Sequence, residues 1–568
     1  MNLLPEVKKL ELFGYTVKKK ALRPYSGELD ARVLSALGML PASEDGLSSV
    51  FRVGDGDGED YTLKIEADTV EITASGPRGA FYAVQTLRQI FAEDEIPALY
   101  IEDYPDFGYR GVYHDVTRGK VPKLETLKSL VDTLAYYKIN SLQLYVEHTY
   151  EFRECAPILA SRGYLTSAEL RELDGYCKER FIDFIPSIAT FGHMYEILEL
   201  EEYRHLRVFP DYVSSSNKWL ERMSQHTINP MTDGSFELVK SLIDQYVPNF
   251  TSGYFNICGD ETFDLKKLSE KTGGAIDEGR VYVDFIKKII SHIKSKGLKV
   301  MMWGDILLRH PEVIDDLPLD TIFLNWDYAK EPSEKNVEKF AKTGRPLIVC
   351  PGTSTWNKIS ENVATSEGNI SKMAEYGYRN GAIGLLNTNW GDWGNVCSIE
   401  LSLFGLSLGA EKSWNAEGKI DGDYYRRASM AVYGDPDGVD IIKSIDKLYT
   451  PGGWTSLLDA YSKLSANEER RPFDVSDEEL TRVKEEYSRL TEAVSSSAIH
   501  PQIKEEMLLA VEGMCVMTEL LAKLAGRVFE RVTDTDAWCE KFSAMWQRKN
   551  KESELTRITD AFKFIDKI

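Results

Sequence analysis

The sequence predicts a TIM (β/α)8 barrel that is preceded by a small α+β domain and followed by a helical C-terminal region. Two observations predict the barrel: residues 105–415 contain eight short β-rich runs, and long polar stretches of helical character separate these runs. A third observation is that most of the runs finish in a cluster of Asp, Glu, His, Asn or Trp. In a barrel of parallel strands such clusters converge on one mouth, where the active site of this fold lies.

The length and composition indicate a multidomain globular protein. The chain has 568 residues, which is longer than a domain with a single hydrophobic core usually is. Of these residues, 43% are hydrophobic and 28% are charged. We place the domains at 1–103, 104–418 and 419–568. The formal net charge of −22 repels phosphate backbones and anionic membrane surfaces, so we expect neither nucleic acid nor a membrane as a partner.

The first domain is predicted to combine strands with one amphipathic helix. Apolar residues alternate with polar ones over 61–65 and again over 70–72, which is typical of strands with one buried face. The segment GPRGAFYAVQTLRQIF (76–91) then repeats apolar residues at helical spacing. We expect this helix to cover the sheet and to carry no chemistry.

The barrel strands are predicted from β-rich runs in the second domain. The eight runs are 109–115, 139–147, 181–188, 254–260, 299–305, 321–327, 345–350 and 381–390. An apolar core alone does not require tryptophans and carboxylates at the same end of several strands. The residues of this kind are Trp303, Asp305, Trp326, Asp327, Trp390, Asp392 and the pair Asp260 and Glu261. The sequence therefore predicts a pocket with aromatic walls and carboxylates.

The third domain is predicted to be helical. In SDEELTRVKEEYSRL, Ser476 and Glu479 have the spacing of a capping box, and an apolar stripe follows. A second apolar stripe runs over 503–524, where we interpret the methionines as core residues and not as a cofactor site.

The cysteines and the amino terminus indicate the cellular compartment in which we expect the protein. The seven cysteines are odd in number, widely spaced and without a CxxC pair, so we expect reduced thiols. The amino terminus has no basic start followed by a long apolar stretch. We therefore expect a cytoplasmic protein, unless an export signal has been removed from the chain.

The residue types at the predicted mouth favour a carbohydrate as ligand. Aromatic rings stack on the apolar faces of sugars, and carboxylates accept hydrogen bonds from their hydroxyls. Asp260 and Glu261 are sequence neighbours, which we expect to point in different directions from a strand end, so they do not suit the roles of facing acid and nucleophile. Cleavage in which the 2-acetamido group of the sugar acts as nucleophile would give each carboxylate a separate task.

The GDE sequence at 259–261, after YFNIC, is similar to the Asp-Glu catalytic pair of family 20 glycoside hydrolases, the β-N-acetylhexosaminidases. The resemblance covers about residues 60–400 and implies a retaining exo-enzyme that removes terminal β-linked GlcNAc, and also GalNAc, from glycans or glycoconjugates. It implies Glu261 as the acid, Asp260 as the group that orients the acetamido nitrogen, an oxazolinium intermediate and no cofactor. The oligomeric state is left open, and a homodimer is one of the states considered.

Further motifs extend the resemblance to substrate-binding residues. RGVYHDVTRG resembles the first-strand motif of the family, which implies that Arg118 holds the hydroxyls at carbons 3 and 4. ATFGHM resembles the third-strand motif and implies that His193 is a partner of the acid machinery. The remaining pocket residues that the resemblance implies are Trp303, Trp326 and Trp390, with Asp392 holding the hydroxyls at carbons 4 and 6.

The sequence departs from the family pattern at two strands. At the second strand the chain has LQLYVEHTYEF, where Glu147 or His148 is the candidate substitute for the usual histidine and aspartate, and we count Glu147 among the substrate-binding residues. At the seventh strand VCPGTSTWNK lacks the family tyrosine that contacts the acetamido oxygen. Tyr328 is one candidate to supply this hydroxyl, and the other interpretation is that Trp356 lines the pocket there.

Two other functions are compatible with a barrel of this kind. A metal hydrolase would need ligand spacings such as HxH or HExxH, which do not occur, so we expect no metal and no nucleotide cofactor. A non-catalytic glycan-binding protein could use the same aromatic pocket, but binding does not require neighbouring acid and amide-orienting carboxylates. We therefore expect an enzyme.

Overall fold

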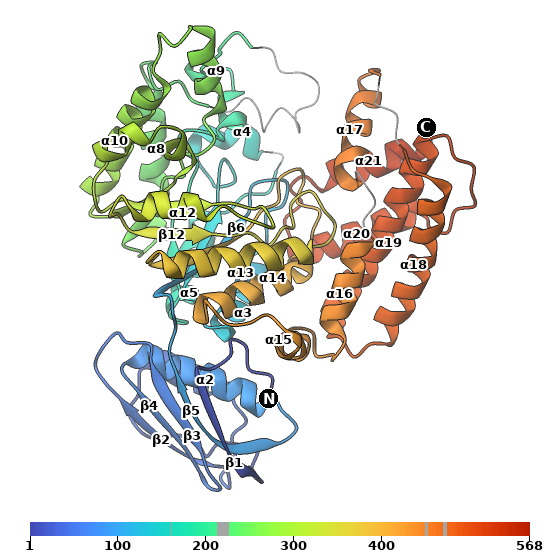
Figure 1. The fold of residues 1–568 in the computed structure, drawn as a ribbon. Helices are drawn as coiled ribbons and strands as arrows, with labels where there is room; N and C mark the ends of the chain where they lie inside the picture. Colours follow the sequence, from blue (N-terminus) through green and yellow to red (C-terminus); the bar gives the residue numbers. More distant parts are fainter. Residues whose placement is uncertain (161, 213–226, 449–452, 470–473) are drawn as a thin grey trace.

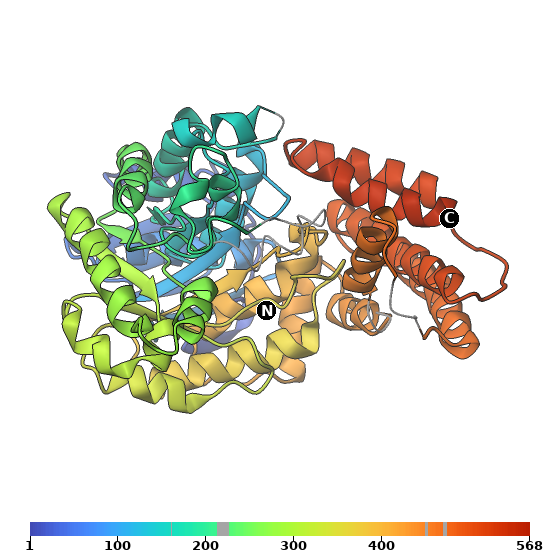
Figure 2. The same ribbon diagram turned by 90° about the horizontal axis from the view of Figure 1, so that it is seen from above.

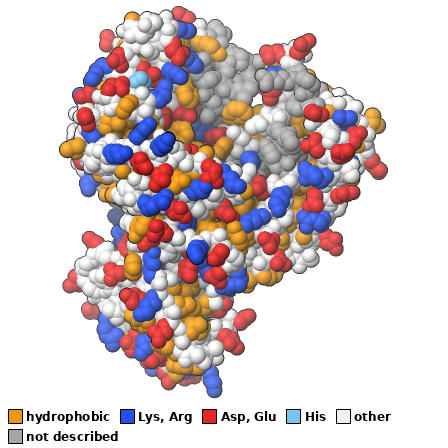
Figure 3. Space-filling model, in the orientation of Figure 1, with side chains coloured by type: hydrophobic (Ala, Val, Ile, Leu, Met, Phe, Trp, Pro, Cys, Tyr) orange, Lys and Arg blue, Asp and Glu red, His pale blue; other side chains and the backbone are white. Residues whose placement is uncertain are grey.

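The computed structural model describes residues 1–160, 162–212, 227–448, 453–469 and 474–568 (Figure 1). A small sheet domain lies at one end of the barrel, and the C-terminal helices stand beside the barrel in both ribbon views (Figures 1 and 2). On the face that Figure 3 shows, acidic and basic side chains are interspersed and not gathered into one patch. This arrangement confirms the predicted fold class.

The N-terminal domain is a five-stranded sheet in the order β1-β5-β3-β4-β2. Its elements are β1 (Lys9–Val17), α1 (Ala31–Leu37), β2 (Ser48–Val53), β3 (Tyr61–Ile65), β4 (Thr69–Ala74), α2 (Pro77–Phe91) and β5 (Ile96–Asp103). Figure 1 shows α2 between this sheet and the barrel. On the barrel side, the rings of Phe81 and Tyr82 contact Phe181 and Trp414. The helix is therefore buried on two sides, and the prediction that it covers the sheet is confirmed.

Eight parallel strands form the barrel, as predicted. They are β6 (Tyr109–Asp115), β7 (Ser141–Tyr145), β8 (Asp183–Ile185), β9 (Tyr254–Asn256), β10 (Lys299–Trp303), β11 (Ile322–Trp326), β12 (Leu347–Cys350) and β13 (Gly384–Asn389). Each strand pairs with its neighbours in sequence and β13 pairs with β6, while a bridge between Ser187 and Asn256 joins β8 to β9. Most strands are shorter than their predicted runs because the polar and aromatic residues at the ends belong to the loops of the mouth.

Helices surround the barrel and cover its apolar outer surface. The longer ones are α3 (Leu124–Tyr136), α5 (Ser167–Lys178), α8 (Ser235–Tyr246), α9 (Phe263–Lys271), α10 (Glu278–Ser295), α12 (Glu334–Ala341), α13 (Val363–Arg379) and α14 (Leu403–Trp414). The short ones are α4 (Ala156–Leu159), α6 (Tyr195–Leu198) and α11 (Asp305–Arg309). A separate cluster of buried rings and aliphatic side chains fills the barrel interior, with Tyr113, Tyr145 and Trp303 among its largest members.

The C-terminal region is helical, which confirms that prediction. Its helices are α15 (Gly422–Ala428), α16 (Gly438–Lys447), α17 (Gly453–Ser465), α18 (Asp477–Ser496), α19 (Pro501–Leu524), α20 (Thr535–Lys549) and α21 (Leu555–Lys567). Ser476 and Glu479 form the capping box at the start of α18. Within the described residues, none of the helices combines the length and the apolar character that crossing a membrane requires. The domain boundaries at 103/104 and 418/419 fall beside β5 and between α14 and α15, and they stay predictions.

Candidate active site

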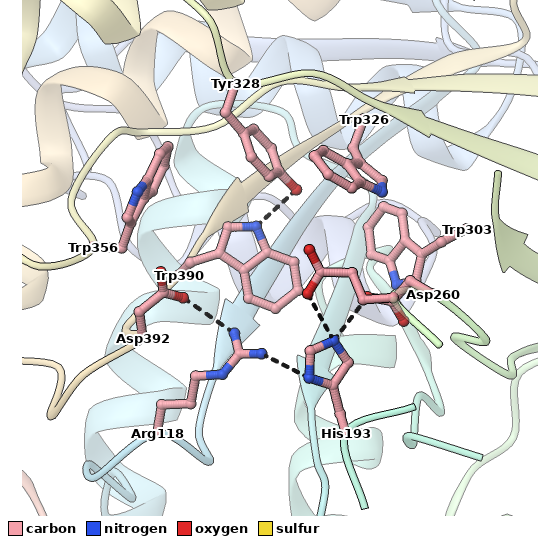
Figure 4. A pocket seen from close by; sticks show the side chains of 10 residues that line it. Arg118, His193, Asp260, Trp303, Trp326, Tyr328, Trp356, Trp390 and Asp392 are labelled. Carbon is pink, nitrogen blue, oxygen red and sulfur yellow. Dashed lines mark hydrogen bonds and ion pairs between the residues drawn. The ribbon is translucent and has the colours of Figure 1, made fainter. Parts of the chain in front are cut away.

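A cavity opens at the carboxyl ends of the barrel strands and encloses about 580 Å³ including its mouth (Figure 4). This volume lies within the range of small-molecule sites. The residues that line it are Arg118, His193, Asp260, Glu261, Trp303, Trp326, Tyr328, Trp356, Trp390 and Asp392. Most of the residues that the sequence placed at the mouth are among them, and the exceptions are Glu147, His148, Asp305 and Asp327. The cavity therefore brings together carboxylates, one histidine, one arginine and five aromatic side chains.

Asp260 and Glu261 converge on one histidine. Nε2 of His193 lies 3.3 Å from Oδ2 of Asp260 and 3.3 Å from Oε2 of Glu261. The expectation that the two carboxylates point in different directions is therefore wrong. Strand alternation does not apply to them because β9 already ends at Asn256, and the backbone is left-handed at Cys258 (φ 55°) and at Glu261 (φ 49°).

The loop that carries His193 is pressed against the loop of the two carboxylates. A Cβ atom on Gly192 would lie 2.3 Å from the backbone oxygen of Asp260, so only glycine permits this approach. The hydroxyl of Thr190 donates a 2.6 Å hydrogen bond to the carbonyl of Ile257. From the other side, Oδ2 of Asp305 accepts a 3.1 Å hydrogen bond from the backbone N–H of Glu261. These contacts explain how the ATFGHM segment positions the carboxylate pair.

The environment of His193 favours its positive charge. Burial acts to lower the pKa of this imidazole, but the charges and hydrogen bonds of Asp260 and Glu261 outweigh burial and the opposing charge of Arg118, and they raise the pKa to about 10. The side chain of Glu261 is 26% exposed, whereas that of Asp260 is 12% exposed. Glu261 is therefore the carboxyl with the better access to a bound molecule.

His193, Asp260 and Glu261 are also the one trio, among the described residues, whose ligand atoms lie close enough to hold a metal ion. The imidazole nitrogen that faces the carboxylates would have to lose its proton to coordinate a metal. The same two carboxylates stabilise that proton, because they raise the pKa of His193 to about 10. The arrangement therefore suits proton sharing better than metal coordination.

Arg118 and Asp392 form an ion pair at the side of the cavity opposite Asp260 (Figure 4). Nη1 of Arg118 lies 3.2 Å from Oδ1 of Asp392, and its guanidinium is also 3.6 Å from Asp115 and 3.7 Å from Glu147. Burial raises the pKa of Asp392 to about 6 although Arg118 opposes the rise. Three carboxylates thus surround one guanidinium, and its Nη2 lies 3.4 Å from Nδ1 of His193.

Glu147 lies beside Arg118 and not in the cavity wall. Its Oε1 accepts a 2.7 Å hydrogen bond from the hydroxyl of Tyr145, and it lies 3.7 Å from Nε of Arg118. His148 lies next to it, with Nδ1 3.9 Å from Oε2 of Glu147. Glu147 therefore lies behind a pocket residue, and not in the direct contact with substrate that the sequence had led us to expect.

Aromatic rings form the rest of the cavity wall. Trp326 and Tyr328 stack with ring centroids 5.2 Å apart, and Tyr328 contacts Trp356 at 5.3 Å. The ring centroids of Trp303 and Trp390 lie 6.2 Å apart. The two candidates that the sequence left open, Tyr328 and Trp356, both line the cavity.

Asp115 is a residue of the site that the sequence analysis did not assign. Its carboxylate accepts hydrogen bonds from the backbone N–H groups of Thr117, Arg118 and Gly391 at 2.9, 3.1 and 3.0 Å. It therefore joins the loop after β6 to the loop after β13. The signal in the sequence was its position at the end of the first barrel run, which it shares with residues that line the pocket.

The comparisons with family models cover most of the N-terminal domain and the barrel. The model described as "Glycosyl hydrolase family 20, catalytic domain" matches residues 107–378. The model described as "Glycosyl hydrolase family 20, domain 2" matches residues 16–104. Together these two matches extend over well more than half of the chain.

Two curated relatives share low sequence identity with the chain. The chain is 28% identical to a beta-hexosaminidase of Porphyromonas gingivalis over 283 residues, which cover 44% of this chain and 36% of the relative. It is 24% identical to a beta-hexosaminidase of Vibrio furnissii over 348 residues, covering 55% of this chain and 54% of the relative. The chain thus spans about half the length, or less, of these curated relatives.

Solved structures share the fold. The chitobiase of Flavobacterium johnsoniae aligns with a TM-score of 0.62 at 18% identity and covers 99% of each chain. The N-acetyl-beta-hexosaminidase of Streptomyces plicatus aligns with a TM-score of 0.58 at 20% identity and covers 76% of this chain and 94% of that chain. A GH20 exo beta-N-acetylglucosaminidase of Vibrio harveyi, solved in complex with N-acetylglucosamine, has a TM-score of 0.59 at 19% identity and covers 76% of each chain. At these identities the likeness shows a common fold.

Proposed function

Because the chain belongs to glycosyl hydrolase family 20, we propose that it is a retaining exo-β-N-acetylhexosaminidase that removes terminal β-linked GlcNAc, and GalNAc as a second substrate, from glycans. The relatives named above carry hexosaminidase names, and one of the related structures contains N-acetylglucosamine. The observation that carries the proposal is the convergence of Asp260 and Glu261 on His193 inside an aromatic cavity.

The convergence of Asp260 and Glu261 on one histidine supports a nucleophile that comes from the substrate. In an ordinary retaining glycosidase two carboxyl groups face each other across the scissile bond, about 5–5.5 Å apart. Asp260 and Glu261 instead contact the same imidazole nitrogen from adjacent positions in the chain, so they lie on one side of the cavity. The third lining carboxylate, Asp392, is paired with Arg118. A nucleophile supplied by the substrate fits this arrangement.

The proposed first step breaks the glycosidic bond. The more exposed carboxyl, Glu261, transfers its proton to the leaving oxygen while the acetamido carbonyl oxygen of the substrate bonds to the anomeric carbon. The product of this step is an oxazolinium ring, whose positive nitrogen is stabilised by the carboxylate of Asp260. The leaving group departs with the proton that Glu261 gave up.

The proposed second step restores the enzyme. Glu261, now a carboxylate, takes a proton from water, and the water oxygen bonds to the anomeric carbon as the ring bond to the acetamido oxygen breaks. Two successive inversions at this carbon give net retention of configuration. His193 keeps both carboxyl groups in place during the two steps, because its Nε2 lies 3.3 Å from each of them.

The remaining cavity residues fit the sugar in this scheme. The ion pair of Arg118 and Asp392 presents donors and acceptors to ring hydroxyls, since a guanidinium donates and a carboxylate accepts. The indoles of Trp303, Trp326 and Trp390 enclose a methyl-sized apolar group and exclude water from the reacting centre.

The test is hydrolysis of an aryl β-N-acetylglucosaminide by the purified chain, with the matching β-glucoside as the substrate that lacks the nucleophile. We expect cleavage of the first and almost none of the second, and loss of at least a hundredfold in the Glu261→Gln variant when the aryl group is a poor leaving group such as phenyl. Glu237→Gln, on the exposed side of α8, is the matched control and keeps the parent rate. Binding of GlcNAc without turnover by a folded parent would instead favour a glycan-binding protein.

A further inference from the structure

The C-terminal helical region contacts the two loops that carry Arg118 and Asp392. The connection between α20 and α21 runs along the loop after β6, and Trp454 of α17 reaches the loop after β13. We propose that this region is a positioning part of the active site, which holds the Arg118 and Asp392 ion pair in place through Trp454 and the segment 549–554. The inference rests on the proposed function for its kinetic consequences, but its structural part is testable without turnover.

The segment 549–554 pairs with the loop after β6 in the manner of a short antiparallel strand. The N–H of Lys551 donates to the carbonyl of Val121 at 2.9 Å, and the N–H of Lys123 donates to the carbonyl of Lys549 at 2.9 Å. Pro122 and Asn550 form the antiparallel bridge between these contacts. Backbone pairing of this kind fixes the direction of the loop over several residues.

The pairing extends to the residue directly after Arg118. The N–H of Glu554 donates to the carbonyl of Gly119 at 3.2 Å. Gly119 has a left-handed backbone (φ 98°), and a Cβ atom there would lie 2.8 Å from the carbonyl oxygen of Gly394. The loop that carries Arg118 is therefore held on one side by the C-terminal segment and on the other by the loop that carries Asp392.

Trp454 acts on the Asp392 loop. Its Nε1 donates a 2.5 Å hydrogen bond to the carbonyl of Trp393, the residue after Asp392. This loop makes a tight turn with left-handed backbone at Asp392 (φ 44°) and at Asn395 (φ 50°), which Asp and Asn adopt more readily than other non-glycine residues. The hydrogen bond from the buried indole fixes the carbonyl in the middle of this turn.

A lysine joins the two loops and the C-terminal region at one point. Nζ of Lys120 donates a 2.6 Å hydrogen bond to the carbonyl of Cys397 and lies 5.1 Å from the ring centroid of Trp546. Lys120 is only two residues beyond Arg118, and Cys397 is five beyond Asp392. Movement of the C-terminal region would therefore act on both members of the ion pair together.

The test compares two tryptophans whose indole N–H groups donate hydrogen bonds to different parts of the protein. Trp454 donates to the Asp392 loop, whereas Trp538 donates a 3.0 Å hydrogen bond to the carbonyl of Leu509 within the helical region. Both indoles are buried and both contact the ring of Phe562. Trp454→Phe and Trp538→Phe thus make the same chemical change in similar packing, and Trp538→Phe is the control for loss of stability.

We expect Trp454→Phe to lower kcat/KM on the aryl N-acetylglucosaminide by about fivefold or more, mainly through KM, and Trp538→Phe to change it less than twofold. In an Asp392→Ala background the effect of Trp454→Phe should shrink to below about twofold, because the contact it supports has gone. Equal effects of the two tryptophan variants, or an undiminished effect in the Asp392→Ala background, would overturn the proposal.

Hydrogen exchange separates this inference from the proposed function. Amides of peptides covering 390–397 should exchange faster in Trp454→Phe than in the parent, and Trp538→Phe should leave them unchanged. Unchanged exchange in Trp454→Phe overturns the positioning role whatever the activity. If the parent proves inactive, a specific rise in exchange, together with weaker binding of GlcNAc to Trp454→Phe than to Trp538→Phe, supports the positioning role while the proposed hydrolysis fails.

Discussion

The hydroxyl of Tyr328 accepts a 2.8 Å hydrogen bond from Nε1 of Trp390, and the two side chains reach this contact from the ends of β11 and β13. Burial raises the pKa of Tyr328 well above its ordinary value, so the hydroxyl keeps its proton. The indole supplies the donor in this contact, so the tyrosine proton is available to an acceptor. The hydroxyl of Thr388 is a hydrogen-bond partner of Tyr328 in the structure, and in the proposed complex the acetamido carbonyl of the substrate takes its place.

Tyr328→Phe is therefore expected to lower kcat/KM on an aryl N-acetylglucosaminide by about tenfold, since one hydrogen bond to the attacking oxygen is lost. The control is Tyr378→Phe, which removes a hydroxyl from a ring that is 43% exposed. Steady-state kinetics on the parent and both variants make the comparison. Equal rates for Tyr328→Phe and the parent would show that the hydroxyl does not contact the reacting group.

Periodic apolar runs predicted the barrel, and the residues at the ends of these runs predicted the tryptophans and carboxylates of the cavity wall. The other lining residues were expected only from the family resemblance, and they are Arg118, His193, Tyr328 and Trp356. The sequence did not predict the convergence of Asp260 and Glu261, which depends on left-handed backbone at Cys258 and Glu261. It placed Glu147 among substrate contacts because sequence position does not reveal which way a side chain turns after a strand ends.

The contacts of the C-terminal region were also beyond the sequence analysis. Trp454 and Trp393 are far apart in the chain, and their hydrogen bond involves a backbone carbonyl, which any residue type could offer. The pairing of 549–554 with the loop after β6 likewise uses backbone groups. Side-chain patterns carry no signal for such contacts, so only the packing of the helices on the barrel could show them.

His193 is expected to be positively charged at neutral pH. Its pKa of about 10 lies above the ordinary value of 6.5, so its contribution to stability is fully present below pH 6.5 and is lost as the pH rises toward 10. The difference in apparent melting temperature between the parent and His193→Gln should therefore shrink over this range. In nuclear magnetic resonance spectra the ring signals of His193 should not titrate between about pH 5.5 and 8.5. A midpoint near 6.5 would contradict the charge assignment.

The affinity for the sugar is expected to fall in mild acid because of Asp392. Burial raises the pKa of this carboxyl to about 6, and only the ionised form accepts hydrogen bonds at both oxygens. Calorimetric titration with GlcNAc should therefore show weaker binding as the pH falls from 7 to 5. The Asp392→Asn variant should bind weakly at both pH values, and a parent-like pH dependence in this variant would assign the effect to another group.

Arg118→Lys tests the guanidinium fork without removing the positive charge. One ammonium cannot contact Asp115, Glu147 and Asp392 in the geometry that the guanidinium provides, so we expect a higher KM and a lower melting temperature. The destabilisation should approach about 3 kcal/mol, because the enclosed carboxylates lose the geometry of a shared charged partner, and Asp392 loses its hydrogen bond to that partner. Arg482→Lys, on an exposed face of α18, is the control. A KM equal to that of the parent would remove Arg118 from the substrate contacts.

The separate tasks of Glu261 and Asp260 predict different responses to the leaving group. Glu261 protonates the departing oxygen, so its proton matters less when the leaving group is already stable as an anion. Glu261→Gln should therefore lose at least a hundredfold on an alkyl or sugar aglycone, but far less on a dinitrophenyl N-acetylglucosaminide, for which release of the aglycone needs no acid. Asp260→Asn should lose a similar factor on both substrates, because stabilisation of the oxazolinium nitrogen is needed whatever departs.

Rates of the two variants across a series of aryl N-acetylglucosaminides would measure this difference. The slope of log kcat/KM against the pKa of the leaving phenol should be steep for Glu261→Gln and parent-like for Asp260→Asn. Added azide should raise the rate of Glu261→Gln where opening of the intermediate limits turnover, because azide attacks the anomeric carbon without a general base. Parallel slopes for the two variants would show that the adjacent carboxylates share one task, and the geometry around His193 would then need another chemical explanation.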